Sequence, residues 1–485
     1  MKIRIGDKID KSTPMLCGFI MEGSENILGA GNTIKNEAVE QSIRDIKGTF
    51  GTVAVIPLPH KPYRRILLAG LGKKERIDRD SIRFVSGKIA QKAAELRLNE
   101  FSVILPEPAV DAVLAASQIV EGCKMSLYKF EKFKSKEQHA VPDLYIQTAK
   151  PKEISGAVKT AEVISEGVLF AKEVANLPPN QCTPSILAEL ARSLARRNGI
   201  KCRIISKSAL KKRGFGGITA VGQGSRNEPK LILLEYMGSL RSQKPIVLVG
   251  KAVTFDTGGI SLKTGESINE MKFDKCGGCT VLGIIKAASE MNLSENIVGI
   301  IPAVENMPGG GSYRPDDIIR LYSGKTAEIL NTDAEGRLIL ADAISYGEQH
   351  YSPRAIIDFA TLTGACIVAL GNDMAGMVSN NDSLACKIQE SSERTAEKIW
   401  RLPLNDDYMD MIRSDVADMK NIGIGRAAGT ITAAAFLKNA VRDTPWVHLD
   451  IAGVAWTQKA TKEKPYNPKG ATGFGVRLVL DYLQN

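Results

Sequence analysis

Histidine is scarce in this sequence, with four residues among 485. His60, His139, His350 and His448 are far apart, and no pair has the HExxH spacing of helical zinc proteases. Cysteine is scarce as well: its eight residues show no regular spacing, and a chain of this length does not need disulfides to fold. These absences exclude an HExxH metalloprotease and a small disulfide-framed domain.

Long apolar runs are also missing. The segment Met1–Asp7 lacks the apolar core of a signal peptide, and no uninterrupted apolar stretch is long enough to span a bilayer. We therefore expect a cytoplasmic protein with no membrane partner. With 44% hydrophobic and 24% charged residues, the sequence has the composition of a globular chain, and its length predicts two domains.

Residues 1–150 have the pattern of a small α/β domain without an obvious catalytic cluster. A helix is predicted at 81–96, and the runs that predict strands are 52–56, 65–70 and 101–105. The amphipathic, proline-free stretch 153–174 then predicts a helix, so that residues 151–175 connect the first domain to a second one, 176–485. In this second domain, strands alternate with helices as in a doubly wound sheet, and they are expected at 230–234, 245–249, 296–301, 327–330 and 355–359.

The segment Asn331–Leu338, with the sequence NTDAEGRL, concentrates charge after an apolar strand. Asp333, Glu335 and Arg337 occupy alternate positions, so in extended backbone all three would project to the same side. Crowded carboxylates have raised pKa values or recruit a metal ion. A divalent-ion site is therefore the first hypothesis, and the alternative is a polar turn that caps the helix predicted at 338–349.

A second charged cluster follows the strand predicted at 245–249. Lys251 comes at the carboxyl end of that strand, and Asp256, Lys263 and Asp274 follow, separated by glycines that allow tight turns. Apolar residues are interleaved with these charges, so the loop is partly buried and its charges must be paired or ligated. The interleaved residues are Phe255, Ile260, Leu262, Met271 and Phe273.

These segments resemble the signatures of the leucyl aminopeptidase (cytosol aminopeptidase) family of two-metal exopeptidases. The resemblance lies in Gly250–Lys263, Met271–Asp274 and Asn331–Leu338, and the last of these is highly specific. It runs from the middle of the second hundred residues to the C-terminus. Further blocks match in the family's order: 176–180, 183–184, 221–225, 360–365 and 450–453.

The resemblance implies two adjacent divalent ions held by Lys251, Asp256, Asp274, Asp333 and Glu335. Asp256 and Glu335 would bridge both ions, Asp274 and the Lys251 amine would complete one site, and the Asp333 carboxylate and main-chain carbonyl would complete the other. Two nearby dications would lower the pKa of Lys251 enough for its neutral amine to bind. Ligands that are mostly oxygen favour manganese, magnesium or zinc without selecting among them.

The family pattern also implies a mechanism. A water between the two ions supplies hydroxide at neutral pH, one ion takes the free α-amine of the substrate, and Lys263 helps to polarise the scissile carbonyl. Arg337 holds a bicarbonate ion that serves as general base; the alternative for Arg337 is a salt bridge to a ligand carboxylate. The implied substrate pocket suits a leucine-like side chain, although each position could equally be core packing, and it consists of Met271, Thr361, Leu362, Gly364, Ala452 and Ala455.

The expected protein is thus an aminopeptidase that releases N-terminal residues from short peptides. The resemblance implies a smaller N-terminal α/β domain, a larger C-terminal α/β/α catalytic domain with a mixed sheet, and a homohexamer whose active sites face an interior cavity. Ala252 stands where many relatives have glycine, and Lys275–Thr280 replaces a run of small residues. Both departures could shift substrate preference or metal affinity.

Two features lie outside this pattern. Cys276 and Cys279 have CxxC spacing, for which we expect buried thiols, with an oxidation-sensitive switch as the alternative. The net charge of +10 includes two basic groups that could mark a DNA-binding surface, so a DNA-binding role, alone or beside peptidase activity, is the alternative function; a solvated surface explains them equally well. The groups are Lys201, Arg203, Lys207, Lys211, Lys212 and Arg213, and Lys73, Lys74, Arg76, Arg79 and Arg83.

Overall fold

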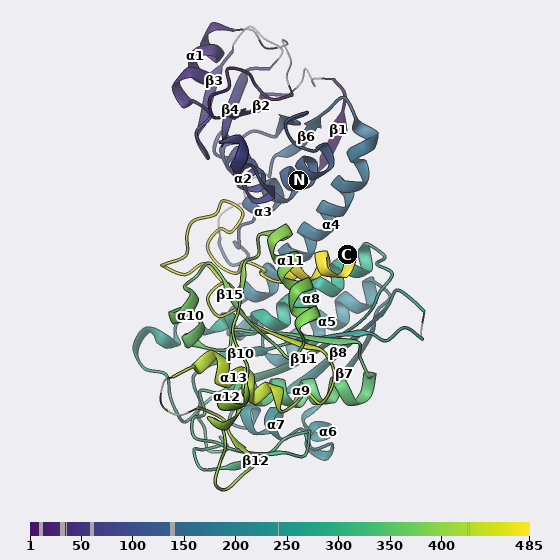
Figure 1. Ribbon diagram of the computed structural model, residues 1–485, viewed down its shortest axis with the longest axis vertical. Coiled ribbons are helices and arrows are strands. Elements are labelled where there is room, and N and C mark those ends of the chain that lie inside the picture. Colours follow the sequence, from purple (N-terminus) through teal and green to yellow (C-terminus); the bar gives the residue numbers. More distant parts are fainter. Residues whose placement is uncertain are drawn as a thin grey trace. The chain divides into compact units, whose positions relative to one another are not determined.

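A computed structural model shows how the chain is organised (Figure 1). It describes residues 1–485 except 9–12, 30–33, 35, 59–62, 136–140, 241, 424 and 426. The chain forms two compact units: one comprises Met1–Glu166 with Glu463–Pro468, and the other comprises Gly167–Lys462 with Lys469–Asn485. Among the helices of the described residues, none has both the length and the hydropathy needed to cross a membrane.

The N-terminal unit contains a six-stranded sheet in which all neighbouring strands are parallel except the edge pair β3–β4. Its strand order is β1 (Ile3–Gly6), β6 (Asp143–Gln147), β5 (Glu100–Ile104), β2 (Met15–Met21), β4 (Arg65–Gly72) and β3 (Val53–Pro57). The helices are α1 (Glu37–Ile46), α2 (Arg79–Glu95) and α3 (Ala112–Ser126). The sequence predicted β3, β4, β5 and α2 within two residues at each end but did not identify β1, β2 or β6.

Helix α4 (Pro151–Asn176) extends the helix predicted at 153–174 by two residues at each end. The second unit then forms a nine-stranded sheet, of which β18, β14, β9 and β11 are parallel neighbours and the outer strands include antiparallel pairs. The sheet is therefore mixed, as expected. Its order is β16 (Ile399–Arg401), β15 (Ala375–Ser379), β18 (Trp446–Asp450), β14 (Ala355–Ala360), β9 (Ile246–Gly250), β11 (Asn296–Asn306), β8 (Lys230–Met237) and β7 (Lys201–Ile205), with β10 (Ala252–Asp256) also paired to β11.

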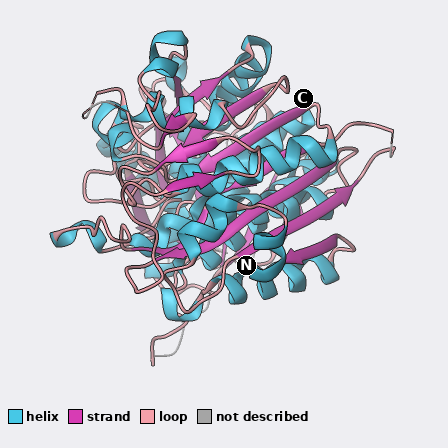
Figure 2. Ribbon diagram, turned by 90° about the horizontal axis from the view of Figure 1, so that it is seen from below, coloured by secondary structure: helices cyan, strands magenta, loops and turns pink. Residues whose placement is uncertain are grey.

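Helices cover both faces of this sheet (Figure 2). Gly299 of β11 packs against Ile285 of α8 (Cys276–Glu290), while its neighbour Ile300 packs against Gly347 of α9 (Gly336–Tyr351). Because successive residues of a strand point to opposite faces, α8 and α9 lie on opposite sides of the sheet. The other helices are α5 (Pro184–Arg197), α6 (Lys207–Lys212), α7 (Gly216–Gly222), α10 (Gly364–Leu370), α11 (Asp382–Thr395), α12 (Asp406–Asp410), α13 (Gly429–Lys438) and α14 (Val476–Gln484).

The strand predicted at 327–330 does not belong to the large sheet. It is the short β13 (Thr326–Glu328) of a separate three-stranded sheet, with β12 (Ile318–Arg320) and β17 (Met419–Lys420) as neighbours. The backbone N–H of Leu330 already donates to the side chain of Asn421, at 2.8 Å, so the ladder ends where the charged segment begins. The prediction identified a strand but placed it in the wrong sheet.

Part of the positive charge is not available on the surface. Arg83 is 1% exposed and forms ion pairs with Glu121 and Asp80, at 2.9 and 2.8 Å, so it was wrongly grouped with surface cations. In the other basic group, Lys201 forms an ion pair with Glu235. DNA binding by the remaining cations stays a prediction.

Candidate metal centre

The carboxyl ends of the central strands supply the groups of the site. Lys251 follows β9, Asp256 ends β10, and Asn306 ends β11. Thr361 follows β14, and Asp450 ends β18. Because these strands are parallel, their carboxyl ends meet at one edge of the sheet, which is where open α/β folds bind ligands.

The segment Asn331–Leu338 reaches this edge as a turn rather than as a strand. The Asn331 side chain accepts a hydrogen bond from the Asp333 N–H at 2.8 Å, which bends the backbone, and Glu335 has helical angles at the start of α9. The predicted alternation of Asp333, Glu335 and Arg337 in extended backbone is therefore wrong. The alternative is confirmed in part: the segment is a polar turn that leads into α9, with Glu335 at the N-cap position, but the Glu335 side chain makes no capping hydrogen bond.

Lys251 is 3% exposed and joins the two charged segments. Its Nζ lies 2.8 Å from Asp274 Oδ1 and 2.9 Å from Glu335 Oε1, and it donates to the Thr361 carbonyl at 2.9 Å. Burial alone would lower the pKa of Lys251, but the carboxylates of Asp274, Glu335 and Asp256 outweigh burial and raise it. Without metal, Lys251 is therefore an ammonium that neutralises the surrounding acids.

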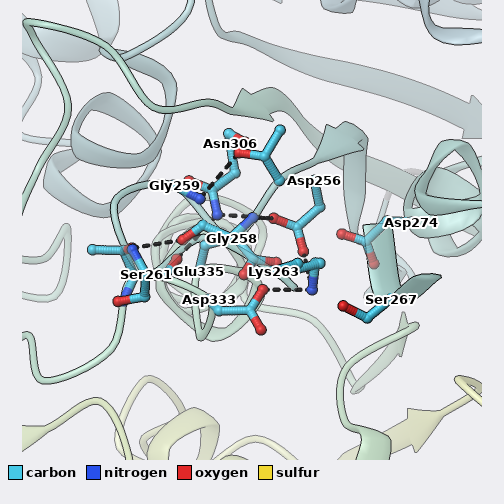
Figure 3. Close-up of polar contacts among 12 residues, drawn as sticks. Asp256, Gly258, Gly259, Ser261, Lys263, Ser267, Asp274, Asn306, Asp333 and Glu335 are labelled. Carbon is cyan, nitrogen blue, oxygen red and sulfur yellow. Dashed lines mark hydrogen bonds and ion pairs between the residues drawn. The ribbon is translucent and has the colours of Figure 1, made fainter. Parts of the chain in front are cut away.

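Lys263 lies between Asp256 and Asp333 (Figure 3). Its Nζ lies 2.8 Å from Asp256 Oδ2 and 2.5 Å from Asp333 Oδ1. Burial again favours a lower pKa for Lys263, and the carboxylates of Asp256, Glu335 and Asp333 again raise it. The four carboxylates are thus arranged around two cations.

The oxygen atoms of the cluster fit divalent ions. Single oxygens of Asp256, Asp333 and Glu335 lie within 4.8 Å of one another, close enough to share an ion. Asp274 Oδ2 and Glu335 Oε2 are buried without a hydrogen-bond partner, and burial raises the pKa of Asp274 and Asp333. Buried carboxylate oxygens without donors are costly unless a cation binds them. The residues present therefore fit the implied metal ligands.

Arg337 lies in the first turn of α9 and is 7% exposed. One guanidinium nitrogen donates to the Asn421 carbonyl at 2.7 Å, while the buried Nε has no partner among the described residues. Among the described residues Arg337 forms no ion pair, so the alternative of a salt bridge to a ligand carboxylate is not observed. Burial lowers its pKa to about 10, which leaves a cation at neutral pH that can hold a small anion.

Asp450 assembles part of the predicted substrate pocket. Its Oδ1 accepts hydrogen bonds from the N–H groups of Leu362, at 3.1 Å, and Ala452, at 3.2 Å. Met271 begins the short helix Met271–Lys275, whose Phe273 ring stacks on Trp456, the neighbour of Ala455, at 5.5 Å. Thr361 contacts Asp274, and Gly364 begins α10 and is exposed.

Sequence analysis did not identify the asparagines that hold the charged loops together. Asn306 donates to Asp256 Oδ1 at 2.9 Å and to the Thr332 carbonyl at 3.0 Å, which ties the two charged loops to each other. Asn421 donates to the Asn331 carbonyl from a segment far along the chain. A single asparagine carries no spacing pattern, so nothing in the sequence indicated these roles.

Replacing Asn306 by alanine is expected to weaken metal affinity by about 10- to 100-fold, because groups that orient metal ligands contribute that much. Isothermal titration with Mn²⁺ measures the change. The matched control is Asn296→Ala at the opposite end of β11, where the buried side chain bonds to the loop at Ser239, Leu240 and Gln243. Equal metal affinity in Asn306→Ala and the wild type would contradict this role.

In the part of the chain that the structure describes, Cys276, His350 and His448 bond to residues outside the charged cluster. Cys276 and Cys279 are 4% and 1% exposed, and burial raises the pKa of the Cys276 thiol to about 12, which favours the interpretation as inert buried thiols. His448 bonds to Asp358 inside the sheet, and His350 stacks on Tyr346. His60 and His139 lie outside the described residues.

Carboxylates and lysines converging at the carboxyl edge of a mixed α/β sheet define a metal-dependent hydrolase. The chain belongs to the cytosol aminopeptidase family, whose members are metal-dependent exopeptidases acting on peptides. Residues 169–480 match the catalytic domain of that family and residues 35–137 match its N-terminal domain.

Individual relatives agree with this assignment. The chain is 57% identical to a probable cytosol aminopeptidase of Cenarchaeum symbiosum, over 99% of this chain and 98% of the relative. It is 45% identical to one of Syntrophotalea carbinolica, over 87% and 86% of the two chains. A solved structure of the bottromycin maturation enzyme BotP in complex with Mn superposes with a TM-score of 0.88 at 29% identity, covering 97% of this chain and 99% of that one.

Proposed function

We propose that this protein removes N-terminal residues, preferably leucine-like ones, from short peptides at a site holding two divalent metal ions. The observation that carries the proposal is the convergence of four carboxylates on two lysines, with buried carboxylate oxygens that lack hydrogen-bond donors. We assign this activity to a catalytic domain of residues 176–485.

Five side chains would hold the ions. Asp256 and Glu335 would contribute to both, Lys251 and Asp274 to one, and Asp333 to the other. When bound, two such ions supply an acidified water and a Lewis acid for the scissile carbonyl. Lys251 would have to release its proton to bind as an amine. The neighbouring carboxylates oppose that release, and the positive charge of two bound ions would favour it. Manganese or zinc suits this ligand set, and magnesium is a third candidate.

Two further residues would act on the substrate. Lys263 is held at the cluster by Asp256 and Asp333. There its ammonium would donate a hydrogen bond to the carbonyl oxygen as negative charge develops. Arg337, whose Nε has no partner, would hold bicarbonate, and the bound anion would carry a proton to the leaving amine.

The test uses chelator-stripped protein with leucine amide and its N-acetylated counterpart, before and after addition of Mn²⁺ or Zn²⁺ in bicarbonate buffer. We expect the metal to restore hydrolysis of the free-amine substrate alone, because the α-amine is the group that the site recognises. Hydrolysis of both substrates, or of neither by folded and metal-loaded protein, would contradict the proposal.

Replacing Gly364 by alanine is expected to reduce kcat/KM for leucine amide about tenfold while sparing alanine amide. The added methyl group would narrow the substrate pocket, and one methyl group in an apolar pocket changes kcat/KM by roughly that factor. A β-carbon at Gly364 meets no atom within 4 Å, so the fold accommodates it. The ratio of kcat/KM for the two amides in each protein is the measurement. An unchanged ratio would show that Gly364 does not contact the substrate side chain. The other residues of the proposed pocket are Met271, Thr361, Leu362, Ala452 and Ala455.

Assembly and location follow from the family rather than from a measured property of this chain. We propose a homohexamer, which would limit access to short peptides, and a cytoplasmic location, as the relatives' name suggests. Sedimentation of the purified protein tests the first proposal. No specific observation favours the DNA-binding alternative.

A further inference from the structure

The N-terminal unit contains a cavity of about 540 Å³ that the peptidase site does not use. It lies beyond the carboxyl ends of three parallel neighbours, β1, β6 and β5. Asp7 follows β1, Leu105 follows β5, and Thr148 follows β6, and all three line the cavity. All the described residues that line it belong to the first unit.

Chain topology makes this edge a natural ligand site. From β2 the chain continues to β3 and β4 on one side, whereas from β5 it continues to β6 on the other side, with β2 and β5 adjacent. The strand order thus reverses between β2 and β5. In open α/β sheets, a reversal of this kind leaves a crevice at the carboxyl ends of the strands, and ligands bind there. Gly29, in the loop after β2, also lines the cavity.

The lining is acidic although the whole chain has a net charge of +10. Asp7, Glu107, Asp111 and Glu153 line the cavity, and among the lining residues that the structure describes Lys150 is the one cation. The Lys150 ammonium already lies 3.4 Å from Glu153. A phosphate or a carboxylate would therefore enter against repulsion, whereas an ammonium or guanidinium group would be attracted.

The hydrogen-bonding groups of the lining also favour a cationic ligand. Gln147 Oε1 is buried and accepts no hydrogen bond, and Gln147 lines the cavity. Next to it, Thr148 donates to Glu107 Oε1 at 3.1 Å, so this carboxylate is anchored at the wall. An acceptor without a donor, together with an anchored carboxylate, favours a ligand that donates hydrogen bonds and carries positive charge.

We infer that this cavity binds a small organic cation with an amino or guanidinium group, about the size of an amino acid. The cationic group lies against Glu107 and Gln147, and the rim carboxylates attract it electrostatically. The cavity volume falls in the range of small-molecule sites. This inference does not depend on the peptidase proposal, because none of the residues that carry it belongs to the metal centre.

Agmatine is a suitable probe because it has both cationic groups and no carboxylate. Titration calorimetry of the full-length, manganese-loaded protein should show saturable binding, and Glu107→Gln should weaken it about tenfold or more, since a hydrogen bond to a charged group contributes that much. The Gln side chain still accepts from Thr148, so the wall is kept. Asp7→Asn, at the rim, should weaken binding by a smaller factor through its charge alone.

Two controls separate this site from other acidic surfaces. Glu95→Gln removes a carboxylate from the same unit and should leave agmatine affinity unchanged. Glu95 is the last residue of α2 and lies before the amino end of β5, whereas the cavity lies at the carboxyl end. Glu335→Gln, in the metal centre, should also leave it unchanged. Equal affinity in the wild type, Glu107→Gln and Asp7→Asn would overturn the inference. Loss of binding in Glu335→Gln, or binding of adenosine monophosphate instead of agmatine, would overturn it as well.

Discussion

Replacing Glu335 by glutamine is expected to lower kcat/KM for leucine amide by about 10³-fold or more, equivalent to roughly 4 kcal/mol of transition-state stabilisation. Glutamine keeps the size of the side chain but removes the negative charge. Glu335 is 1% exposed, lies 2.9 Å from Lys251 Nζ, and has a second buried oxygen without a donor. A neutral amide at that position cannot contribute to two cations, so both proposed metal positions are weakened together.

The measurement is steady-state hydrolysis with a metal count on the same sample. The matched control is Glu348→Gln in the same helix α9, where the carboxylate accepts only from the backbone of Arg442 and Thr444. It should retain wild-type kcat/KM. Activity of Glu335→Gln within tenfold of the wild type would show that Glu335 does not support the reaction.

Replacing Gly336 by alanine is expected to reduce both metal affinity and kcat/KM by about 100-fold, although Gly336 is itself no ligand. A β-carbon at Gly336 would lie 2.7 Å from Lys251 Cε and 2.8 Å from Lys251 Nζ. Lys251 is buried, and its Nζ is held by Asp274, Glu335 and the Thr361 carbonyl. The added methyl group therefore displaces the lysine from the carboxylates with which it must act.

Gly156→Ala is the matched control, because Gly156 is also a helical glycine and a β-carbon there meets no atom within 4 Å. It should raise the free energy of unfolding by about 0.5–1 kcal/mol, as alanine does in an unobstructed helix. Manganese titration by calorimetry, with thermal unfolding of each variant, separates a local effect from loss of the fold. Wild-type metal affinity in Gly336→Ala would contradict the close packing of Lys251 on this residue.

The charged segments of the candidate site could be predicted from the sequence, but the arrangement of their side chains could not. Lys251 lies where a short apolar strand indicated a carboxyl edge, and that placement is general to parallel sheets. Asp256 was predicted in a loop, whereas it ends β10. The alternation of Asp333 and Glu335 suggested a strand, because spacing alone does not reveal that the Asn331 side chain bends the backbone. Local side-chain hydrogen bonds of this kind override periodicity.

The same limit applies to the rest of the fold. The apolar strands at the centre of the large sheet were predicted, because burial on both faces leaves a continuous apolar run. β13 was assigned to the wrong sheet, because strand pairing depends on partners such as β17, which lies far along the chain. Asn306 and Asn421 act through contacts across 50 and 90 residues of sequence, and no local pattern records such contacts.

The most direct test of the account is the number of metal ions that one chain needs. Chelator-stripped protein would be titrated with Mn²⁺ in bicarbonate buffer, with bound metal counted by mass spectrometry and leucine amide hydrolysis measured at each step. The account predicts saturation at two ions per chain, with full activity only when both are bound. Full activity with a single ion, or folded protein that binds none, would contradict the dinuclear site.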